Sequence, residues 1–220
     1  DLLGKRLTNT FSAKYYGLGL SQPASLDGTG EAHSVRNSFS KMGWGLASRY
    51  RISDYTGVKA SFERAYRLQE VGEMFGNGFN QIANPDLKPE QSYNLNLGAY
   101  TGLLHKGHHL FIEGSAFYRD AKDFIHSVLY LSNAQVSQYQ NTSKVKITGV
   151  EGELRYNYLQ RMGAFLNASY QRAVNNTKYP LGSTSGTPEA TYLNKIPNQP
   201  WFFGNAGMHY TFHGLLNPHQ

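Results

Sequence analysis

The histidines His105, His108 and His109 are the residues of this chain whose type and spacing come closest to a metal site. Imidazole nitrogens are common ligands of zinc and copper. No carboxylate lies close to these histidines in the sequence, and the chain has no cysteine that would supply a thiolate. We therefore expect them to lie at an interface of the folded chain without a bound metal.

Other chemical sites also lack their sequence signatures. The glycine pairs at Gly17 and Gly19 and at Gly28 and Gly30 are not followed by the Lys-Ser/Thr step of a phosphate-binding loop. No local motif places a nucleophilic serine in a strand-to-helix turn, as a hydrolase of that type requires. We expect no catalysis and no cofactor.

The distribution of charge excludes a further class of partner. The net charge is +6, and the 21 lysines and arginines are interleaved with acidic residues along the chain. Proteins that bind nucleic acid usually carry a basic stripe, which this sequence lacks. We therefore expect no nucleic acid partner.

The elements that must position any site are predicted to be β-strands, because apolar and polar residues alternate in about eight segments. These segments cover residues 6–16, 41–50, 56–66, 92–100, 110–119, 150–158, 164–171 and 202–212. Tight links are expected at residues 51–54, 102–107 and 160–162. Long connections are expected at residues 18–37, 67–89, from the fifth segment to about residue 140, and 172–199, and residues 124–131 are themselves β-prone.

This rhythm of long and short connections is typical of an up-and-down β-barrel in an outer membrane. Only 40% of the residues are hydrophobic and the mean hydropathy is -0.52. Apolar runs stay far below the roughly 18 residues that a membrane helix needs. A barrel strand needs no such run, because only every second residue faces lipid. A soluble carbohydrate-binding β-sandwich also alternates and remains an alternative at this point.

In most segments the charged residues fall on one parity, which predicts a polar lumen. Such residues line a substrate path or contact another domain, or they pair with each other across neighbouring strands. The candidate lumen-facing residues are Lys59, Glu63, Glu113, Arg119, Glu151, Glu153 and Arg155.

Large side chains in the long connections are candidates for contact with a ligand from outside, because loops on a rigid scaffold often carry recognition. They equally suit packing of the loops against one another. These residues are Met74, Phe75, Phe79, Tyr130, Tyr139 and Tyr179.

One connection carries a specific motif. It begins after Ala65-Tyr66-Arg67-Leu68 and ends in Asn84-Pro85-Asp86-Leu87-Lys88-Pro89-Glu90. Pro85 and Pro89 favour an extended chain before a strand. This pattern resembles the barrel domain of TonB-dependent outer-membrane receptors, in the style of Bacteroidetes-type bacteria. Further matches follow in order, at Phe117-Tyr118-Arg119, Lys122-Asp123-Phe124-Ile125, Tyr139-Gln140-Asn141, Gly149-Val150-Glu151-Gly152-Glu153 and Ile196-Pro197-Asn198-Gln199-Pro200.

The resemblance implies an all-β fold, an antiparallel up-and-down transmembrane barrel segment that belongs to a 22-stranded barrel. Residues 1–220 are then a partial receptor barrel domain without the plug domain or a signal peptide. The implied function is energised import of a scarce nutrient such as a siderophore, a cobalamin, a glycan or a peptide. The implied partners are outer-membrane lipid, that nutrient, and the TonB complex through the missing plug region. The implied location is the bacterial outer membrane, crossed many times.

An independent eight-stranded barrel, acting as an adhesin or a structural protein, is the alternative, since eight strands are a common closed size. In that case the first and last strands pair with each other. If the chain is instead a segment of a wider barrel, we expect an open, curved sheet with two unpaired edges.

Overall fold

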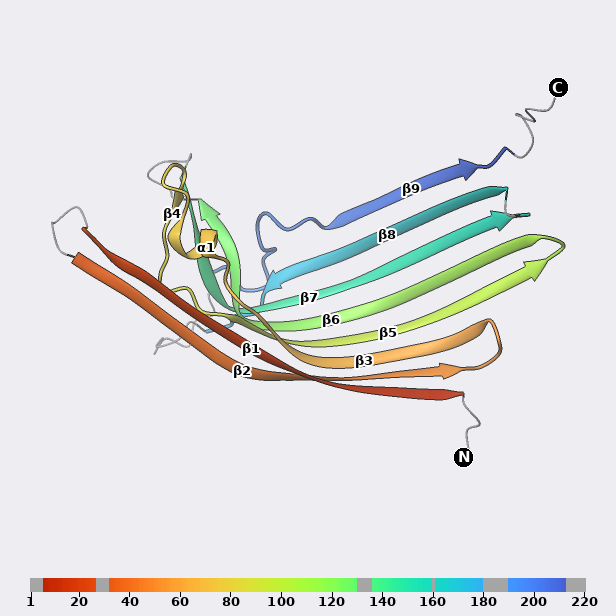
Figure 1. Ribbon diagram of the computed structural model, residues 1–220, viewed down its shortest axis with the longest axis horizontal. Helices are drawn as coiled ribbons and strands as arrows, with labels where there is room; N and C mark the ends of the chain where they lie inside the picture. Colours follow the sequence, from red (N-terminus) through yellow and green to blue (C-terminus); the bar gives the residue numbers. More distant parts are fainter. Residues whose placement is uncertain (1–5, 27–31, 130–135, 160, 180–189, 213–220) are drawn as a thin grey trace, which may run out of the picture.

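The computed structural model describes residues 6–26, 32–129, 136–159, 161–179 and 190–212, which form one curved sheet and one short helix (Figure 1). The strands are β1 (Leu7–Leu26), β2 (Ala32–Arg51), β3 (Thr56–Arg67), β4 (Gln81–Ile82), β5 (Glu90–His105), β6 (His108–Leu129), β7 (Ser137–Tyr158), β8 (Met162–Asn175) and β9 (Phe202–Tyr210). The helix, α1 (Val71–Phe75), lies between β3 and β4. Among the described residues, no helix is long and apolar enough to cross a membrane.

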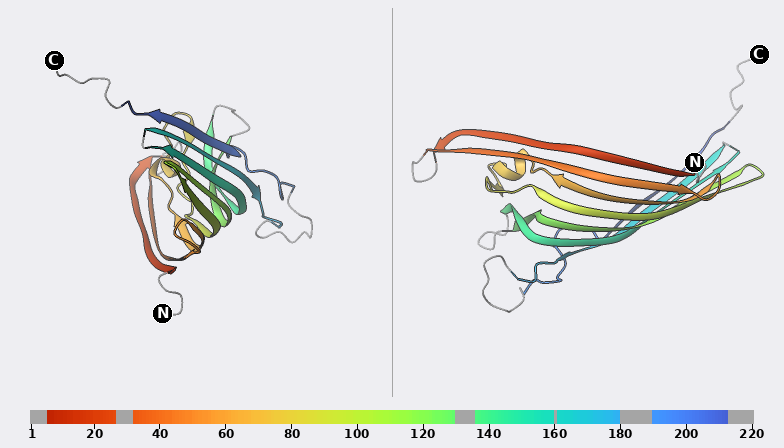
Figure 2. Two further views of the ribbon diagram at one scale, coloured as in Figure 1. Left: turned by 90° about the vertical axis from the view of Figure 1, so that its right-hand side faces the viewer. Right: turned by 90° about the horizontal axis from the view of Figure 1, so that it is seen from below.

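The long strands follow one another across the sheet in chain order, β1-β2-β3-β5-β6-β7-β8-β9, and each pair is antiparallel. The two-residue strand β4 pairs with β7 in parallel. Within the described strands, β1 and β9 are not hydrogen-bonded to each other, so the sheet stays open (Figure 2). The up-and-down order and the open, curved sheet predicted from the sequence are confirmed.

The two ends of the sheet differ in their connections. Short turns join β2 to β3, β5 to β6 and β7 to β8 at one end, which we call the turn side (Figure 1). At the turn between β5 and β6, Lys106 and Gly107 have φ angles of 45° and 86°. Positive φ at both central residues is typical of a two-residue hairpin whose twist matches its strands. Longer connections, including residues 68–89 with α1, lie at the opposite end, the loop side.

The expected long connection at residues 18–37 is wrong. There β1 continues to Leu26 and β2 begins at Ala32, and the two strands pair along nearly their whole length. The register shifts only between Gln22 and Ser25, where Pro23 lacks the amide hydrogen of a regular ladder. Leu18, Leu20 and Leu26 share one parity here, but the glycines and Pro23 among them are typical of a loop, so the alternation was not recognised as a strand.

The pairing register sorts the side chains onto two faces. One row of paired positions runs Ser12, Gly45, Glu63, Asn94, Arg119, and the adjacent row runs Phe11, Leu46, Phe62, Leu95, Tyr118. Since successive residues point to opposite sides of a strand, these rows belong to opposite faces. We call them the polar face and the apolar face.

The apolar face presents large side chains without cover from the described residues. Leu97 and Val150 are each 55% exposed, and Met208 is 82% exposed. On β6 the outward positions from Leu110 to Tyr118 carry no charge. That stretch has about the nine residues that a tilted strand needs to cross the hydrocarbon of a membrane.

The buried core lies at the loop side. Ala121 and Val145 are fully buried, together with Phe124, Ile147, Ala173 and Ile196. A second buried cluster joins Met74 of α1 to Leu87 and to Ile125 of β6. We call the connection that carries α1, residues 68–89, the α1 segment. The α1 segment therefore packs against the sheet, on its concave side (Figure 2).

The close strand packing predicts a sharp contrast between two glycines of β7. A Cβ atom at Gly149 would lie 2.4 Å from Phe117 Cζ and 2.5 Å from the Tyr170 carbonyl oxygen, whereas one at Gly152 would lie no closer than 3.7 Å to any atom. We expect Gly149→Ala to lower the free energy of unfolding by about 1–3 kcal/mol, as overpacking does. Gly152→Ala should change it by less than about 0.5 kcal/mol.

The measurement is the midpoint of urea unfolding, made on the full-length gene product for the wild type and for both variants. Equal midpoints for Gly149→Ala and Gly152→Ala would contradict the pairing of β7 with β6 and β8.

Candidate functional site

The candidate lumen-facing residues all lie on the polar face. Lys59, Ser115 and Glu151 share one row of paired positions, and Glu113 and Glu153 are direct partners in the next. Glu63 and Arg119 share a third row. Arg155 lies two residues beyond Glu153 on β7 and therefore on the same side.

The structure brings some of these candidates together as ion pairs. Lys59 pairs with Glu113, and Arg155 Nε lies 2.8 Å from Glu153 Oε1 on the same strand. Glu63 instead accepts a hydrogen bond of 2.6 Å from Lys14, and Glu151 accepts one of 2.8 Å from Ser115 Oγ. The sequence analysis did not anticipate Lys14 and Ser115. Each of these carboxylates thus has a partner on its own strand, on a neighbouring strand or across one intervening strand.

Two shallow cavities open on the polar face. One, of about 450 Å³, is lined by Arg49, Lys59, Asn96 and other side chains of β1 to β7. The other, of about 220 Å³, is lined by Glu113, Glu151, Glu153 and neighbouring residues of β6 to β9. Ser115 and Glu151 border both. Both donor and acceptor side chains line this face, so it suits a hydrated polar ligand or a polar protein surface.

The loop-side candidates differ in exposure. Met74 is fully buried, and Phe75 and Tyr139 pack against its cluster, so these side chains hold the loops together. Phe79 is 91% exposed and Tyr179 is 48% exposed. Both side chains are therefore accessible at the surface of the described chain. Tyr130 lies outside the described residues.

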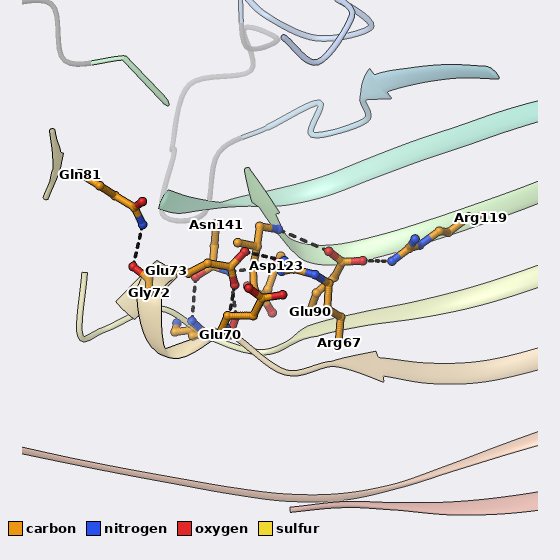
Figure 3. Close-up of polar contacts among 11 residues, drawn as sticks. Arg67, Glu70, Gly72, Glu73, Gln81, Glu90, Arg119, Asp123 and Asn141 are labelled. Carbon is orange, nitrogen blue, oxygen red and sulfur yellow. Dashed lines mark hydrogen bonds and ion pairs between the residues drawn. The ribbon is translucent and has the colours of Figure 1, made fainter. Parts of the chain in front are cut away.

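A buried carboxylate fixes the start of β5, where the connection that carries α1 rejoins the sheet. Glu90 is 1% exposed, its Oε1 pairs with Arg119 Nη2, and its Oε2 accepts a hydrogen bond of 3.4 Å from the Ile125 amide (Figure 3). Sequence reasoning predicted Arg119 but missed Glu90, although it is the last residue of the motif after Pro89. The sequence holds no local signal for this pair, because Glu90 and Arg119 lie 29 residues apart.

A second ion pair fixes the start of α1. Arg67 at the end of β3 pairs with Glu73, which is 6% exposed. The other oxygen of Glu73 accepts a hydrogen bond of 2.9 Å from the Glu70 amide, which is common at helix starts (Figure 3). Burial lowers the pKa of Arg67, but the carboxylates of Glu73, Glu90 and Glu70 together outweigh burial, so the pKa of Arg67 is raised.

The side chain of Asn141 on β7 binds backbone groups of the α1 segment and of β6. Asn141 Nδ2 donates to the carbonyl oxygens of Lys88 (2.9 Å) and Asp123 (2.7 Å), and Asn141 Oδ1 accepts a hydrogen bond of 2.8 Å from the Lys88 backbone amide. Gly76, with a φ of 67°, lets the chain turn after α1, because a Cβ there would meet the Gln81 carbonyl at 2.2 Å. The α1 segment is thus fixed near its start by the Arg67–Glu73 pair and near its end by the bonds between Asn141 and Lys88.

Among the histidines of the turn side, His108 contacts two tyrosines of β7. His108 Nδ1 lies 2.7 Å from the Tyr156 hydroxyl, and the His108 ring lies 4.5 Å from that of Tyr158. In the part of the chain that the structure describes, no group of three or more His, Cys, Asp or Glu side chains is placed to hold a metal ion. At the loop side, burial lowers the pKa of His126, whose Nδ1 lies 3.2 Å from Thr142 Oγ1.

Comparison with known proteins gives a consistent family. A family model described as TonB dependent receptor-like, beta-barrel matches residues 4–218. Among curated proteins, the heme/hemopexin utilization protein C of Haemophilus influenzae (strain 86-028NP) is 25% identical over 144 residues, covering 54% of this chain and 20% of that protein. The chain therefore spans about a fifth of the length of the curated relatives it matches.

Solved structures show the same fold. The copper transporter OprC aligns with a TM-score of 0.66 and 15% identity, covering 94% of this chain and 31% of OprC. The hemophore receptor HasR of Serratia marcescens, in complex with its hemophore HasA and heme, aligns with a TM-score of 0.50 and 19% identity, covering 90% and 35%. At these identities the likeness shows the fold alone.

The buried pair predicts that Glu90 matters more than an exposed glutamate on the same face. Glu90→Ala leaves Arg119, whose side chain is 34% exposed, without its carboxylate and the Ile125 amide without its acceptor, and we expect a loss of about 1.5–3 kcal/mol in the free energy of unfolding. Glu63→Ala is the matched control, because both partners of the Lys14–Glu63 pair are partly exposed and such pairs contribute about 0–1 kcal/mol.

Urea unfolding of the full-length gene product measures both losses, and hydrogen exchange of residues 84–90 locates the effect. Similar losses for the two variants, with no faster exchange in Glu90→Ala, would mean that Glu90 does not fix the start of β5.

Proposed function

The chain belongs to the TonB-dependent receptor-like β-barrel family, and from this we propose that it forms part of the barrel wall of an outer-membrane receptor for nutrient uptake. This is a family of transport receptors and not of enzymes, in agreement with the sequence-based prediction. The domain assignment that we propose is residues 1–220 as part of a receptor barrel, with the plug encoded outside this chain.

The observation that carries the proposal is the contrast between the two faces of the sheet. Leu97, Val150 and Met208 stand exposed on a face that holds no charge between the Leu110 and Tyr118 positions of β6. Water disfavours such a surface, whereas the hydrocarbon of a membrane favours it. The opposite face carries paired charges, as expected for a water-filled or plug-filled lumen.

In this proposal the polar face lines the import path or contacts the plug. Lys59, Glu63, Glu113, Arg119, Glu151, Glu153 and Arg155 are the residues assigned to that role. Pairing such as Lys59 with Glu113 keeps the wall polar without a large field of one sign. Phe79 and Tyr179, which are exposed at the loop side, are the candidates for contact with a nutrient from outside.

The nutrient is proposed from the relatives. Heme is the first cargo to test, because the curated relatives are named for heme/hemopexin utilization and HasR is a hemophore receptor. Copper, a siderophore, a cobalamin, a glycan and a peptide follow. The TonB complex, acting through the plug, would supply the energy.

The independent eight-stranded barrel does not agree with the observed sheet, because the described β1 and β9 do not pair. A soluble sandwich requires two packed sheets, whereas the described strands form one. Both alternatives therefore receive less support than a wall segment of a wider barrel.

Uptake by cells tests the proposed function. The full-length gene is expressed in a bacterial host that lacks its own heme synthesis and heme receptors, with and without its TonB gene. We expect growth on heme only when TonB is present. The same hosts are then supplied with a ferric siderophore, cyanocobalamin or copper. Equal uptake of every nutrient with and without TonB would exclude the proposal.

Assembly in the membrane tests the orientation of the wall. Val150→Arg places a charge on the apolar face, where arginine near the bilayer midplane costs about 2–4 kcal/mol, so less assembled barrel is expected. Glu151→Gln, on the adjacent residue of the polar face, should assemble like the wild type. The readout is heat-modifiable migration of the outer-membrane fraction. Equal assembly of both variants would show that Val150 does not face lipid.

A further inference from the structure

A group of cations lies on the apolar face, just beyond its uncharged part at the loop side. Lys122 of β6 is the direct partner of Lys144 of β7, and Lys146 follows two residues later. Arg172 of β8 pairs with Thr148 and is therefore the diagonal neighbour of Lys146. We call Lys122, Lys144, Lys146 and Arg172 the basic cluster.

Burial shows which way these side chains point. Ala121 and Val145, which are direct partners, are both fully buried in the loop-side core. Lys122 and Lys144 are the next residues along the two strands and are exposed, so they face the opposite side. Lys146 Nζ lies 5.3 Å from the centre of the Tyr118 ring, which belongs to the apolar face.

The basic cluster places like charges side by side, and the described residues do not neutralise them. Two lysines that are direct cross-strand partners on one face repel each other. Asp120, opposite Lys146, is the one acid among the described apolar-face positions of these rows. Within the described part of the chain, none of the four cations forms an ion pair, and Asp120 Oδ1 has no hydrogen-bond partner. An anion from outside the chain would relieve this repulsion.

The opposite rim of the apolar face is different. Its described positions at the turn side carry aromatic residues, histidine and methionine, including His108, Tyr156, Tyr158, Met162 and Tyr210. These described positions include no lysine or arginine. At the loop-side rim, Tyr170 lies two residues before Arg172, with its ring 6.1 Å from that of Trp201. Both rims are thus aromatic, but among the described strand positions of the apolar face only the loop side adds cations, since Lys106 and Arg161 lie in the turns.

We propose that the basic cluster binds the phosphate groups of a lipid in the membrane leaflet at the loop side. This inference rests on the proposed function, because it requires the apolar face to lie in a membrane. Acyl chains then cover the uncharged part of the apolar face. The headgroup phosphates contact Lys122, Lys144, Lys146 and Arg172, which lie next to this part at the loop side. Cationic side chains near an anionic lipid surface attract it strongly. The asymmetry of the rims assigns the anionic lipid to one leaflet.

Lipid binding to the purified full-length receptor tests the proposal. Native mass spectrometry in detergent compares bisphosphorylated lipid A with its phosphate-free form. For the double variant K122Q/K144Q we expect about 30-fold weaker binding of the phosphorylated lipid, the loss that follows when two lysines leave an anionic lipid surface. Lys41→Gln, which removes an exposed cation from the polar face, is the control and should bind like the wild type.

Several outcomes would overturn the proposal. Unchanged binding by K122Q/K144Q, or equal binding of the phosphate-free lipid, would exclude phosphate recognition at this cluster. Displacement of the lipid by an equal concentration of inorganic phosphate would assign the site to a free anion. A receptor dimer that dissociates in the double variant would assign it to a second copy of the chain.

Separate readouts distinguish this proposal from the proposed function. If the receptor reaches the outer membrane and imports heme but binds the two lipids equally, only the lipid site fails. If the receptor binds the phosphorylated lipid selectively but uptake does not depend on TonB, only the transport proposal fails.

Discussion

The side-chain arrangement of this protein depends on an antiparallel register that holds across the sheet. Because side chains alternate sides with a period of two, a slip of one residue between any two strands would bring charges onto the apolar face. The one register shift reported among the described long strands lies between Gln22 and Ser25, at the loop-side end of the first hairpin. The polar face, the apolar face with its uncharged part, and the basic cluster all follow from this constraint.

The loop side adds a different kind of order to the sheet. A single layer buries little by itself, and the fully buried Ala121, Val145 and Met74 lie where residues 68–89 and 190–197 fold back onto it. Polar contacts fix this arrangement, through Glu90 on Arg119 and Glu73 on Arg67. In the proposed receptor, a nutrient that approaches the polar face from outside passes beside an anchored segment and not beside a free loop.

Much of the fold was predictable because a wall with one wet face and one apolar face must alternate. The strand at residues 56–67 and the shared face of Lys59 and Glu113 follow directly from that period. The strands within residues 18–37 were missed because glycines and Pro23 are typical of loops, although Leu18, Leu20 and Leu26 share one parity. The partner of Arg119 was not predictable either, since Glu90 is 29 residues away in sequence and meets it only when β5 and β6 pair.

The strand order has a consequence for how the chain folds. Every long strand of the described sheet lies beside its neighbour in the sequence, so each new pair closes a loop no longer than one connection. The entropy of closing a loop grows with its length, and local pairing speeds folding. The sheet can therefore grow by adding one strand at a time, and the pairing of β9 with β8 across residues 176–201, the longest connection between neighbouring strands, is the slowest step that this connectivity imposes.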